Sequence, residues 1–371
     1  MKIKLYLTAC LLVLGLSCAH AVPAKKGVKR TIKLADGTSV VAELKGDEFA
    51  SYWQADDGKC YVQDIDSHTF KITDKAQVVN RGLAKRQKAN DERIKRFSKR
   101  GPKREITGAF SHFTGTKKGL IILVNFKDVK FGRTHTRAMF DNIANKKGFT
   151  NSLGFKGSVK DYFLAQSNGQ FELDFDVVGP YTLSQNMAYY GAHTKDGDVD
   201  AKAGHMVLEA CQLADKDVNY KDYDWDGDGE VDQVFVIYAG FGEADGGSED
   251  TIWPHESQLL PWVGKPYETK DGVSVNTYAC GNENTYDMLG RSRINGIGTI
   301  CHEFSHCLGY PDLYDTNYSG NFGMGSFDLM CSGSYNGESF CPPNYSAYEK
   351  WIAGWITPTV LDKPASVKGM Q

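Results

Sequence analysis

The sequence has no long apolar stretch after Leu16 and no marked excess of charge of either sign. Without about 20 consecutive apolar residues, the mature chain is not expected to contain a transmembrane helix. The formal net charge of −3 does not favour a nucleic-acid-binding protein. No internal repeat is visible. The remaining composition, 41% hydrophobic and 24% charged residues, is typical of a soluble globular protein.

The first 21 residues have the features of an export signal. Lys2 and Lys4 precede the apolar run Leu5–Leu16, which is short for a membrane span. Small residues then stand at the two positions that signal peptidase reads, which predicts cleavage after Ala21. We therefore expect a secreted, extracellular protein. Cys18 leaves one alternative open, a lipid anchor on this cysteine.

Nine cysteines are present, and their pairing stays open. Export permits disulfides, but connectivity cannot be deduced from sequence. Six cysteines lie between Cys211 and Cys341, and Cys60 stands alone in the N-terminal part. Cys301 and Cys307 flank the candidate metal residues described below, and free, buried thiols are as consistent with the sequence as a bridge.

Residues 22–80 are predicted to form a small β-rich domain. Apolar and polar residues alternate over Thr31–Leu44 and again over Ser51–Val62. Each run has an Asp-Gly pair near its middle, at Asp36 and Asp57. Asp-Gly between alternating runs is a strong hairpin signal.

A basic segment follows at residues 81–107. It contains four Lys-Arg pairs, beginning at Lys85, Lys95, Lys99 and Lys103. One interpretation is a solvated helix or linker. In an exported chain we favour an exposed activation linker that another protease cuts after Lys or Arg. Nucleic-acid binding is disfavoured because few aromatic residues that could stack on bases accompany the charges.

Residues 108–357 are predicted to form an α/β (α+β) domain with a mixed sheet. Gly119–Phe126 and Gln233–Ala239 are continuous apolar runs typical of buried strands. Amphipathic patterns predict helices over Ser158–Gln166, Asp200–Ala214 and Gly298–Leu308. Residues 358–371 are expected to begin a further C-terminal region that the chain holds only in part.

The third predicted helix carries the pattern His302-Glu303-x-x-His306. Two histidines four residues apart share one helix face and can hold one zinc ion with their imidazoles. Glu303 between them can take a proton from a zinc-bound water, which then attacks a peptide carbonyl, and can pass that proton to the leaving amine. The pattern alone occurs by chance, so its continuation matters.

The residues after the helix supply a candidate third ligand. Gly309 can end the helix in a left-handed turn, and Pro311 prevents its continuation. The reversal can return Asp312 to the metal, which completes a site of two nitrogens, one carboxylate and one open position. In the competing arrangement, that of gluzincins, the third ligand is a glutamate on a later helix, and Glu349 is the candidate.

Met330 lies downstream, in Phe327–Asn336. Metzincin peptidases have a methionine turn beneath the metal, and Met330 fits that position, with Met324 as a nearby competitor. The expected role is to shape the floor of the site without ligating the ion.

These residues together resemble the metzincin pattern, and specifically the immune inhibitor A-like peptidases of family M6. The similarity extends from Lys118–Phe126 through Tyr223–Gly247 to Ser326–Gly337, so it covers roughly residues 108–357. The resemblance implies a metzincin-like catalytic domain, with a zinc-binding active-site helix, in an extracellular zinc endopeptidase made as a precursor. Many metzincins have a third histidine where Asp312 stands, which leaves the third ligand less firmly assigned than His302 and His306.

A second metal site is predicted at an acidic loop. Acidic residues alternate from Asp224, and Gly229 stands where a calcium loop needs its sharp turn. The candidate ligands of this structural Ca²⁺ are Asp224, Asp226, Asp228, the carbonyl of Glu230, and Asp232. Phe235 occupies the twelfth position, so the loop is not a complete EF-hand; an acidic surface turn is the alternative.

The overall hypothesis is a secreted, monomeric zinc endopeptidase, whose residues 22–107 keep it latent. Its partners would be protein or peptide substrates and an activating protease, with no nucleic acid. Cys60 is a candidate for latency because a thiolate can displace the catalytic water from zinc; Asp56 and Asp57 are alternatives, as is a purely structural cysteine. The competing hypothesis is a catalytically silent, calcium-stabilised surface or binding protein on a peptidase fold.

Overall fold

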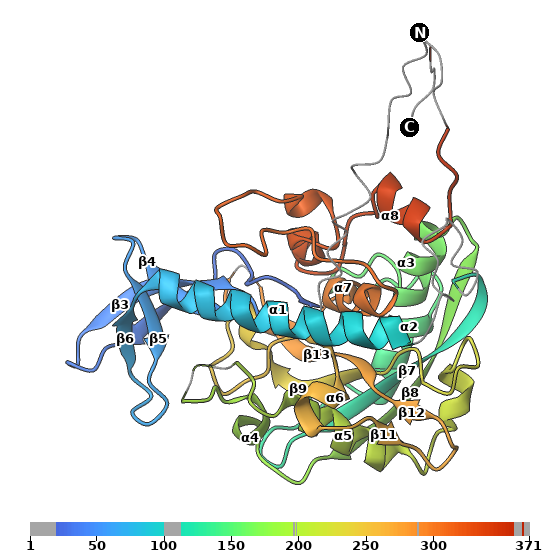
Figure 1. Cartoon of the computed structure of the whole chain (residues 1–371), viewed down its shortest axis with the longest axis horizontal. Helices are drawn as coiled ribbons and strands as arrows, with labels where there is room; N and C mark the ends of the chain where they lie inside the picture. Colours follow the sequence, from blue (N-terminus) through green and yellow to red (C-terminus); the bar gives the residue numbers. More distant parts are fainter. Residues whose placement is uncertain are drawn as a thin grey trace.

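The computed structural model describes residues 20–99, 113–195, 197, 199–287, 289–359 and 366. Within these residues the strands form a small N-terminal sheet, a large sheet made mainly by the remainder of the chain, and a two-stranded ribbon. A long helix runs from the small sheet across the larger part of the molecule (Figure 1). The predicted signal peptide lies almost entirely outside the described residues.

The strands fall into three sheets. The small five-stranded sheet contains, in spatial order, β2 (Lys29–Lys33), β3 (Ser39–Gly46), β4 (Ser51–Ala55), β5 (Cys60–Gln63) and β6 (Phe70–Thr73). The large sheet has the order β1 (His20–Ala21), β10 (His255–Gln258), β13 (Thr277–Tyr286), β9 (Phe235–Phe241), β7 (Gly115–Asn125) and β8 (Phe171–Thr182), with β14 (Ser292–Ile294) also paired to β13. A two-stranded ribbon joins β11 (Tyr267–Glu268) to β12 (Ser274–Val275).

The helices are α1 (Lys75–Lys99), α2 (Arg137–Asn145), α3 (Val159–Gln166), α4 (Met187–Gly191), α5 (Ala203–Ala214), α6 (Leu259–Val263), α7 (Ile297–Cys307) and α8 (Ala347–Ile352). Short 3-10 turns occur at Tyr220–Tyr223, Glu243–Asp245, Gly325–Phe327 and Ser332–Tyr335. The alternation of strands and helices confirms the predicted α/β character of the larger part.

The two predicted hairpins are confirmed. β2 and β3 pair antiparallel, with Ile32 opposite Val40, and β4 and β5 pair with Gln54 opposite Cys60. Gly37 and Gly58 adopt positive φ angles of 86° and 85° at the turns. Glycine reaches this left-handed region without steric cost, which is why Asp-Gly marked both turns.

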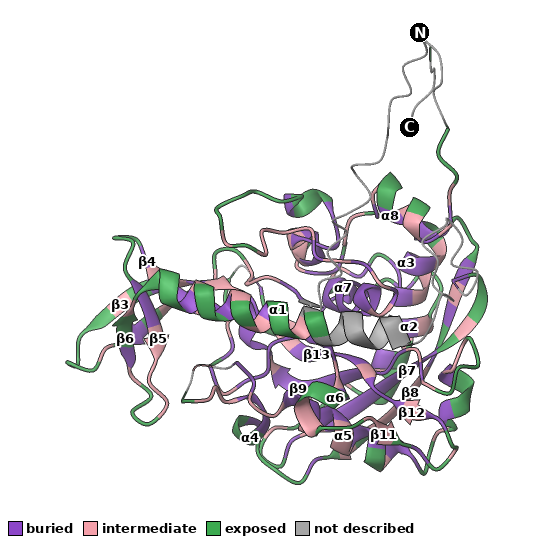
Figure 2. Cartoon of the chain, viewed as in Figure 1, coloured by how far each residue is buried: buried purple, intermediate pink, exposed green. Residues whose placement is uncertain are grey.

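The large sheet is mixed and is covered on both faces. β8, β7, β9 and β13 run parallel, whereas β10 is antiparallel to β13. Along β7, Leu120 and Ile122 belong to one hydrophobic cluster, and Ile121 and Leu123 to another on the opposite face. Because both faces of this strand are buried (Figure 2), its sequence is continuously apolar instead of alternating.

The helices begin at recognisable caps. The side chain of Ser158 accepts a hydrogen bond from the amide of Asp161, whose carboxylate accepts one from the amide of Ser158. This reciprocal capping box explains why α3 starts where the sequence predicted. The predicted helix over Asp200–Ala214 corresponds to α5, which begins at Ala203.

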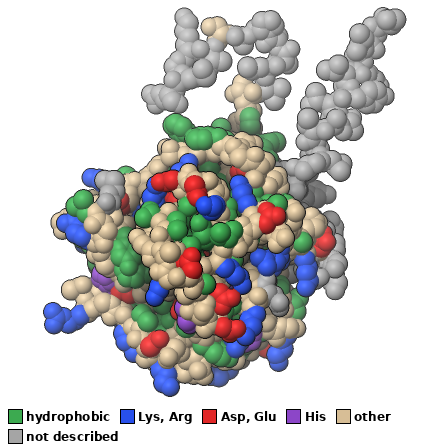
Figure 3. Space-filling model, turned by 90° about the vertical axis from the view of Figure 1, so that its left-hand side faces the viewer, with side chains coloured by type: hydrophobic (Ala, Val, Ile, Leu, Met, Phe, Trp, Pro, Cys, Tyr) green, Lys and Arg blue, Asp and Glu red, His purple; other side chains and the backbone are tan. Residues whose placement is uncertain are grey.

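The basic segment differs from the expected linker. Its described part is helical, because α1 extends over 25 residues from Lys75 to Lys99; residues 100–112 lie outside the described part. Figure 3 views the molecule from the side of the small sheet and shows basic and acidic side chains interspersed over that face, without a field of one sign. The alternative of a solvated helix, with one face buried, fits this segment better than an irregular connector.

Within the described residues, all seven cysteines are free thiols, and Cys307 and Cys341 are the two that are not buried. The described part of the chain also contains no helix that is long and apolar enough to cross a membrane.

Candidate metal centre

Helix α7 lies in the interior and carries the His-Glu-x-x-His pattern. Every residue from Ile297 to His306 is buried. Gly298 permits the close packing, since a Cβ atom at this position would lie 1.9 Å from the carbonyl oxygen of Ser334. The amide of Gly298 also donates to the carbonyl of Ser339 at 2.8 Å. The glycine four residues before His302 therefore lets α7 pack closely against the main chain near Ser334, so that the histidines of this helix are buried.

The chain reverses directly after α7, as predicted. Gly309 has a φ of +97°, in the left-handed region. Its amide donates to the carbonyl of His306 at 2.9 Å, and the amide of Tyr310 donates to the carbonyl of Ser305 at 3.2 Å. This turn directs the following residues back along the helix and brings Asp312 to the two histidines.

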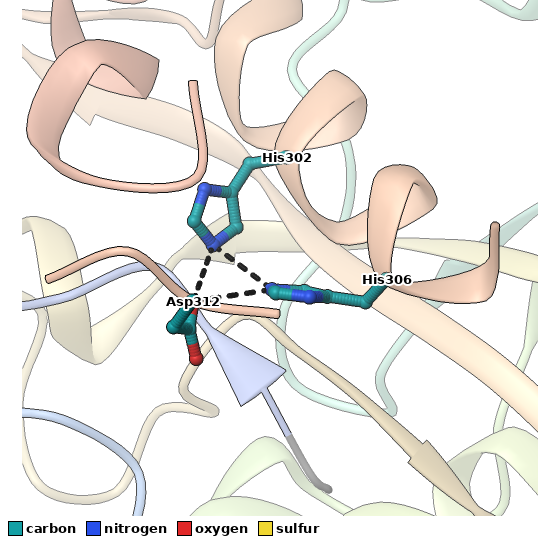
Figure 4. A group of neighbouring side chains, drawn as sticks. All are labelled: His302, His306 and Asp312. Carbon is teal, nitrogen blue, oxygen red and sulfur yellow. Dashed lines mark hydrogen bonds and ion pairs between the residues drawn. The ribbon is translucent and has the colours of Figure 1, made fainter. Parts of the chain in front are cut away.

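Three buried side chains converge at this point (Figure 4). The Nε2 atoms of His302 and His306 are 3.1 Å apart. Each lies 3.3 Å from Oδ1 of Asp312. Four ligands placed tetrahedrally at zinc–ligand distances of 2.0–2.1 Å are separated by about 3.3 Å, so the spacing fits one zinc ion.

Hydrogen bonds fix the orientation of both imidazoles. Nδ1 of His302 lies 2.7 Å from the carbonyl oxygen of Leu329, and Nδ1 of His306 lies 2.8 Å from that of Tyr310. A carbonyl can only accept, so each Nδ1 carries the proton and each Nε2 presents a lone pair. Two lone pairs and a carboxylate oxygen face one another, an arrangement that a cation stabilises. The donor set therefore fits a metal on chemical as well as geometric grounds.

Glu303 lies on the same helix with its side chain fully buried. Its Oε1 accepts a hydrogen bond from the amide of Val22 at 2.7 Å, whereas Oε2 has no hydrogen-bond partner among the described residues. Burial, followed by the negative charge of Asp312, raises the pKa of Glu303 well above its ordinary value. A carboxyl group with a raised pKa suits a group that takes and returns protons.

Met330 is fully buried and follows Leu329, whose carbonyl holds His302. The carbonyl of Met330 accepts from the amide of Leu313 at 2.7 Å, next to Asp312. Main-chain carbonyls of the turn at Met330 thus hold both the ring of His302 and the residue that follows Asp312. Met324, the competitor, is 44% exposed.

Glu349, the alternative third ligand, is engaged elsewhere. It lies in α8, where its Oε2 accepts from the hydroxyl and amide of Ser346 in a capping box. Burial, then the charge of Asp328, raises its pKa to about 8. Among the described residues, the group that can hold a metal here includes Asp312 and not Glu349.

The N-terminal part covers the metal group, which the sequence did not reveal. Arg86 of α1 lies with Nη1 4.0 Å from Oδ2 of Asp312, and its Nη2 donates to Asp47 at 2.5 Å. Tyr318 also donates to Asp47. Beside this pair, both carboxylate oxygens of Glu48 are buried and have no hydrogen-bond partner among the described residues. No local motif marks these residues, because Arg86 and Asp47 are 39 positions apart and Tyr318 is 271 positions from Asp47.

A mixed cluster joins the small sheet to the larger part. Trp53 and Ile32 share a hydrophobic cluster with Trp253 and Ala244. At its edge, Arg30 donates to both oxygens of Glu249, at 2.6 and 2.8 Å. The N-terminal part is therefore docked by apolar contacts and by a partly buried ion pair, in which one guanidinium nitrogen donates to both carboxylate oxygens.

Cys60 lies away from the metal group. It is buried in a small cluster with Ala50, Tyr52 and Val78, and burial raises the pKa of its thiol. Its thiol is not among the ligand atoms that converge on His302 and His306. Asp56 and Asp57 are exposed and form ion pairs with lysines of the small sheet. This position fits a cysteine that only packs in the core of the small sheet better than one that binds the metal and keeps the enzyme latent.

The acidic loop brings together only part of its predicted ligand set. Ligand oxygens of Asp224, Asp226 and Asp232 lie within 4.8 Å of one another, whereas Asp228 is not in that group. Asp224 accepts from the amides of Gly227 and Gly229, at 2.8 and 3.0 Å. Gly229 has a φ of +87°, which provides the expected turn.

Comparison with known proteins identifies relatives of this chain. Residues 109–356 match the family model described as immune inhibitor A peptidase M6, catalytic domain. The chain is 29% identical over 259 residues to the pre-pro-metalloprotease PrtV of Vibrio cholerae, which covers 60% of this chain and 28% of that protein. It is 27% identical over 302 residues to immune inhibitor A of Bacillus thuringiensis subsp. alesti, covering 68% of this chain and 42% of the relative.

The chain thus spans less than half the length of the curated relatives that it matches. The matched region contains the large sheet apart from β1, together with α7 and the three converging side chains. The family resemblance predicted from the sequence is confirmed, and the chain belongs to the immune inhibitor A family of M6 peptidases, whose relatives include a metalloprotease.

Proposed function

We propose that this chain is a secreted zinc endopeptidase, made as a latent precursor, in which His302, His306 and Asp312 hold the ion. The observation that carries the proposal is the convergence of two oriented imidazoles and one carboxylate with Glu303 on the same helix. Zinc bound there would polarise a peptide carbonyl and acidify a water molecule.

In this mechanism Glu303 moves the proton. Its buried carboxylate accepts a proton from the attacking water, and the resulting carboxylic acid donates it to the amine of the leaving fragment. Met330 and the carbonyl of Leu329 keep the floor of the site and the ring of His302 in place.

Casein digestion tests this assignment. After treatment of the precursor with trypsin, we expect hydrolysis that a zinc chelator abolishes and added zinc restores. Glu303→Gln is expected to lower the rate by roughly 10²–10⁴-fold while bound zinc, measured by mass spectrometry of metals, stays near one per chain. Glu268→Gln is the matched control, because Glu268 lies exposed on β11. Activity that persists in Glu303→Gln or in chelator would refute the proposal.

Latency is supported by the way the N-terminal part covers the site. Arg86 and Asp47 lie over Asp312, and the segment around Val22 contacts Glu303. We propose that residues 22–107 keep the enzyme inactive until a protease cuts after Lys or Arg between residues 81 and 107. Sequencing the new N-terminus of the activated enzyme checks this, and activity without any cut in the chain would contradict it.

A structural Ca²⁺ at the acidic loop is the second metal that we propose. Asp224, Asp226 and Asp232 supply three neighbouring carboxylates at the entry to β9. A bound cation would hold this loop against the two-stranded ribbon, since Ser274 and Gly229 are hydrogen-bonded at 2.8 Å. We expect calcium to slow proteolysis of the wild-type chain and to have no effect on Asp226→Asn. Equal proteolysis with and without calcium would remove this site.

The alternative, a catalytically silent and calcium-stabilised binding protein, makes a different prediction. Such a protein would respond to calcium in the proteolysis experiment but would show no casein hydrolysis after removal of residues 22–107.

A lipid anchor on Cys18 remains the alternative to free secretion, and mass spectrometry of the exported protein distinguishes the two. A single-chain enzyme is expected to elute as a monomer in gel filtration.

A further inference from the structure

Helix α8 lies close to α7 and α3 (Figure 1), and one of its residues, Glu349, is almost completely buried. The main-chain carbonyl of Glu349 accepts a hydrogen bond from the hydroxyl of Tyr310 at 3.0 Å. The carbonyl oxygen of Tyr310 in turn lies 2.8 Å from Nδ1 of His306. Glu349 is therefore connected, through one tyrosine, to the group that orients one of the two imidazoles.

The side chain of Glu349 faces the turn that holds the other imidazole. It shares a side-chain hydrogen bond with Asp328, which is fully buried. Oδ1 of Asp328 accepts from the amide of Met330 at 2.8 Å, and this bond closes the turn around Leu329. The carbonyl of Leu329 is the group that accepts from Nδ1 of His302. One residue of α8 thus reaches the supports of both imidazoles.

The hydrogen bond between these two carboxyl groups requires a proton. Oδ2 of Asp328 and Oε1 of Glu349 are buried, and no N–H or O–H group of the described residues donates to either. Two carboxylates can only accept hydrogen bonds, whereas a carboxylic acid can donate one. Oε2 of Glu349 already accepts from the amide and the hydroxyl of Ser346, both at 2.7 Å. Oε1 is therefore the atom of Glu349 that carries the proton toward Asp328.

The surroundings favour one proton on this pair. The titratable groups that face it are one imidazole and three phenols: His302, Tyr162, Tyr310 and Tyr345. Within the described part of the chain, neither carboxyl forms an ion pair with a lysine or an arginine, Lys350 on the same helix included. Two adjacent carboxyl groups in a dry interior do not both ionise at neutral pH. Burial and the charge of Asp328 accordingly raise the pKa of Glu349 to about 8.

We propose that Asp328 and Glu349 are a positioning pair that shares one proton, and that this proton ties α8 to the turn at Met330 and so keeps both metal-binding imidazoles in place. The effect on the metal rests on the proposed zinc peptidase function, whereas the link between α8 and the turn does not. Neither residue touches the substrate or the ion in this scheme. Loss of the shared proton leaves two neighbouring buried carboxylates, which repel each other and loosen the turn.

The variant Glu349→Gln tests the shared proton directly. The amide oxygen of glutamine can keep the bonds from Ser346, and its NH2 group can donate to Asp328 at any pH. A carboxyl group whose pKa is raised in the fold contributes less stability as the pH rises toward and through that pKa. Between pH 6.5 and pH 9, the zinc affinity of the wild-type chain should therefore fall roughly ten-fold relative to that of Glu349→Gln.

Zinc affinity is measured on the full chain by competition with a fluorescent chelator, and the ratio of wild type to variant removes the pH dependence that both chains share. At pH 7, Glu349→Ala should bind zinc roughly ten-fold more weakly than wild type, while still binding one zinc per chain when zinc is in excess. Glu268→Gln is the matched control, because Glu268 lies exposed on β11, and its zinc affinity should equal that of wild type.

A residue that only caps α8 gives a different pattern. It would make Glu349→Ala less stable at every pH, but it would not give the wild type a pH dependence that Glu349→Gln removes. The same pH dependence of zinc affinity in wild type and Glu349→Gln would therefore overturn the proposal. Equal zinc affinity of Glu349→Ala and Glu268→Gln at pH 7 would also overturn it.

Hydrogen exchange of the metal-free wild-type chain covers the case in which the variants do not fold. The amide of Met330, corrected for the intrinsic effect of pH on exchange, should be less protected at pH 9 than at pH 6.5. Unchanged protection would overturn the proposal. The same measurement separates the two hypotheses, because lower protection at pH 9 in a chain that binds no zinc would support the shared proton and refute the proposed peptidase.

Discussion

Replacement of Arg86 by methionine should loosen the N-terminal part from the metal centre. The Arg86 side chain is 6% exposed and Asp47 is fully buried, with Asp312 and Tyr318 close by. Methionine keeps much of the apolar stem but removes the charge, so the buried carboxylate of Asp47 is left without its cationic partner.

The magnitude follows from the burial of this pair. Removing one partner of a buried ion pair costs about 3–5 kcal/mol. Much of this cost disappears when the N-terminal part separates from the metal group and Asp47 is hydrated. The variant therefore favours this separated state, which we call the open state. Taking the lower value of about 3 kcal/mol, the open population should rise roughly a hundred-fold.

Two measurements check this prediction. Hydrogen exchange of α1 should accelerate in Arg86→Met, and uncut precursor should acquire measurable casein hydrolysis. Lys29→Met is the matched control, because Lys29 and Asp56 form a pair at 3.2 Å with side chains 48% and 88% exposed. Such an exposed pair contributes about 0–1 kcal/mol. If Arg86→Met exchanged no faster than Lys29→Met, the reasoning about a buried charged latch would be wrong.

Three further predictions concern the metal ligands, the docking interface and the packing of α7. Asp312→Ala should lose most bound zinc, whereas Glu349→Ala should retain it; loss of zinc only in Glu349→Ala would favour the gluzincin arrangement. Burial lowers the pKa of His193, but the charge and hydrogen bond of Glu243 outweigh it, so this pKa is raised above its ordinary value of 6.5. Protonated His193 therefore stabilises the fold at pH values below 6.5, and this stabilisation is lost as the pH rises through the raised pKa. The Tm of the wild type should exceed that of His193→Gln at pH 5.5, and the difference in Tm should disappear in alkaline buffer. A difference in Tm that does not depend on pH would contradict this linkage. Gly298→Ala should lower the free energy of unfolding by roughly 1–3 kcal/mol through overpacking against Ser334, although alanine normally favours a helix over glycine; thermal unfolding with an unchanged or higher Tm would show that α7 can shift.

The elements that the sequence predicted share one property, which is that their signals are local. The Asp-Gly turns, the apolar run of β7, the capping box at Ser158 and the left-handed Gly309 each depend on a few neighbouring residues. His302, Glu303 and His306 belong to the same class, because four-residue spacing on a helix is enough to place two imidazoles on one face. Asp312 followed from the same local turn.

The basic segment shows where local reasoning was insufficient. From its charge pattern we favoured an exposed activation linker over a solvated helix, because intrinsic helix preference is a weak guide without packing. Tertiary contacts decide the outcome, because Arg86 is buried against Asp47 and close to Asp312 while neighbouring residues of α1 face solvent. One buried arginine in a run of basic residues leaves no trace in the sequence.

By itself, the sequence determined the family, the two hairpins, the main strands and helices, and the three candidate ligands that converge on one point, because each depends on spacing within a short stretch. Only the tertiary structure decided what lies over that point. The contact of Val22 with Glu303 joins residues 281 positions apart, and the contacts of Trp253 and Tyr335 with the same segment are similarly distant. Such contacts arise from the pairing of sheet edges and the docking of separate parts, and no periodicity encodes them.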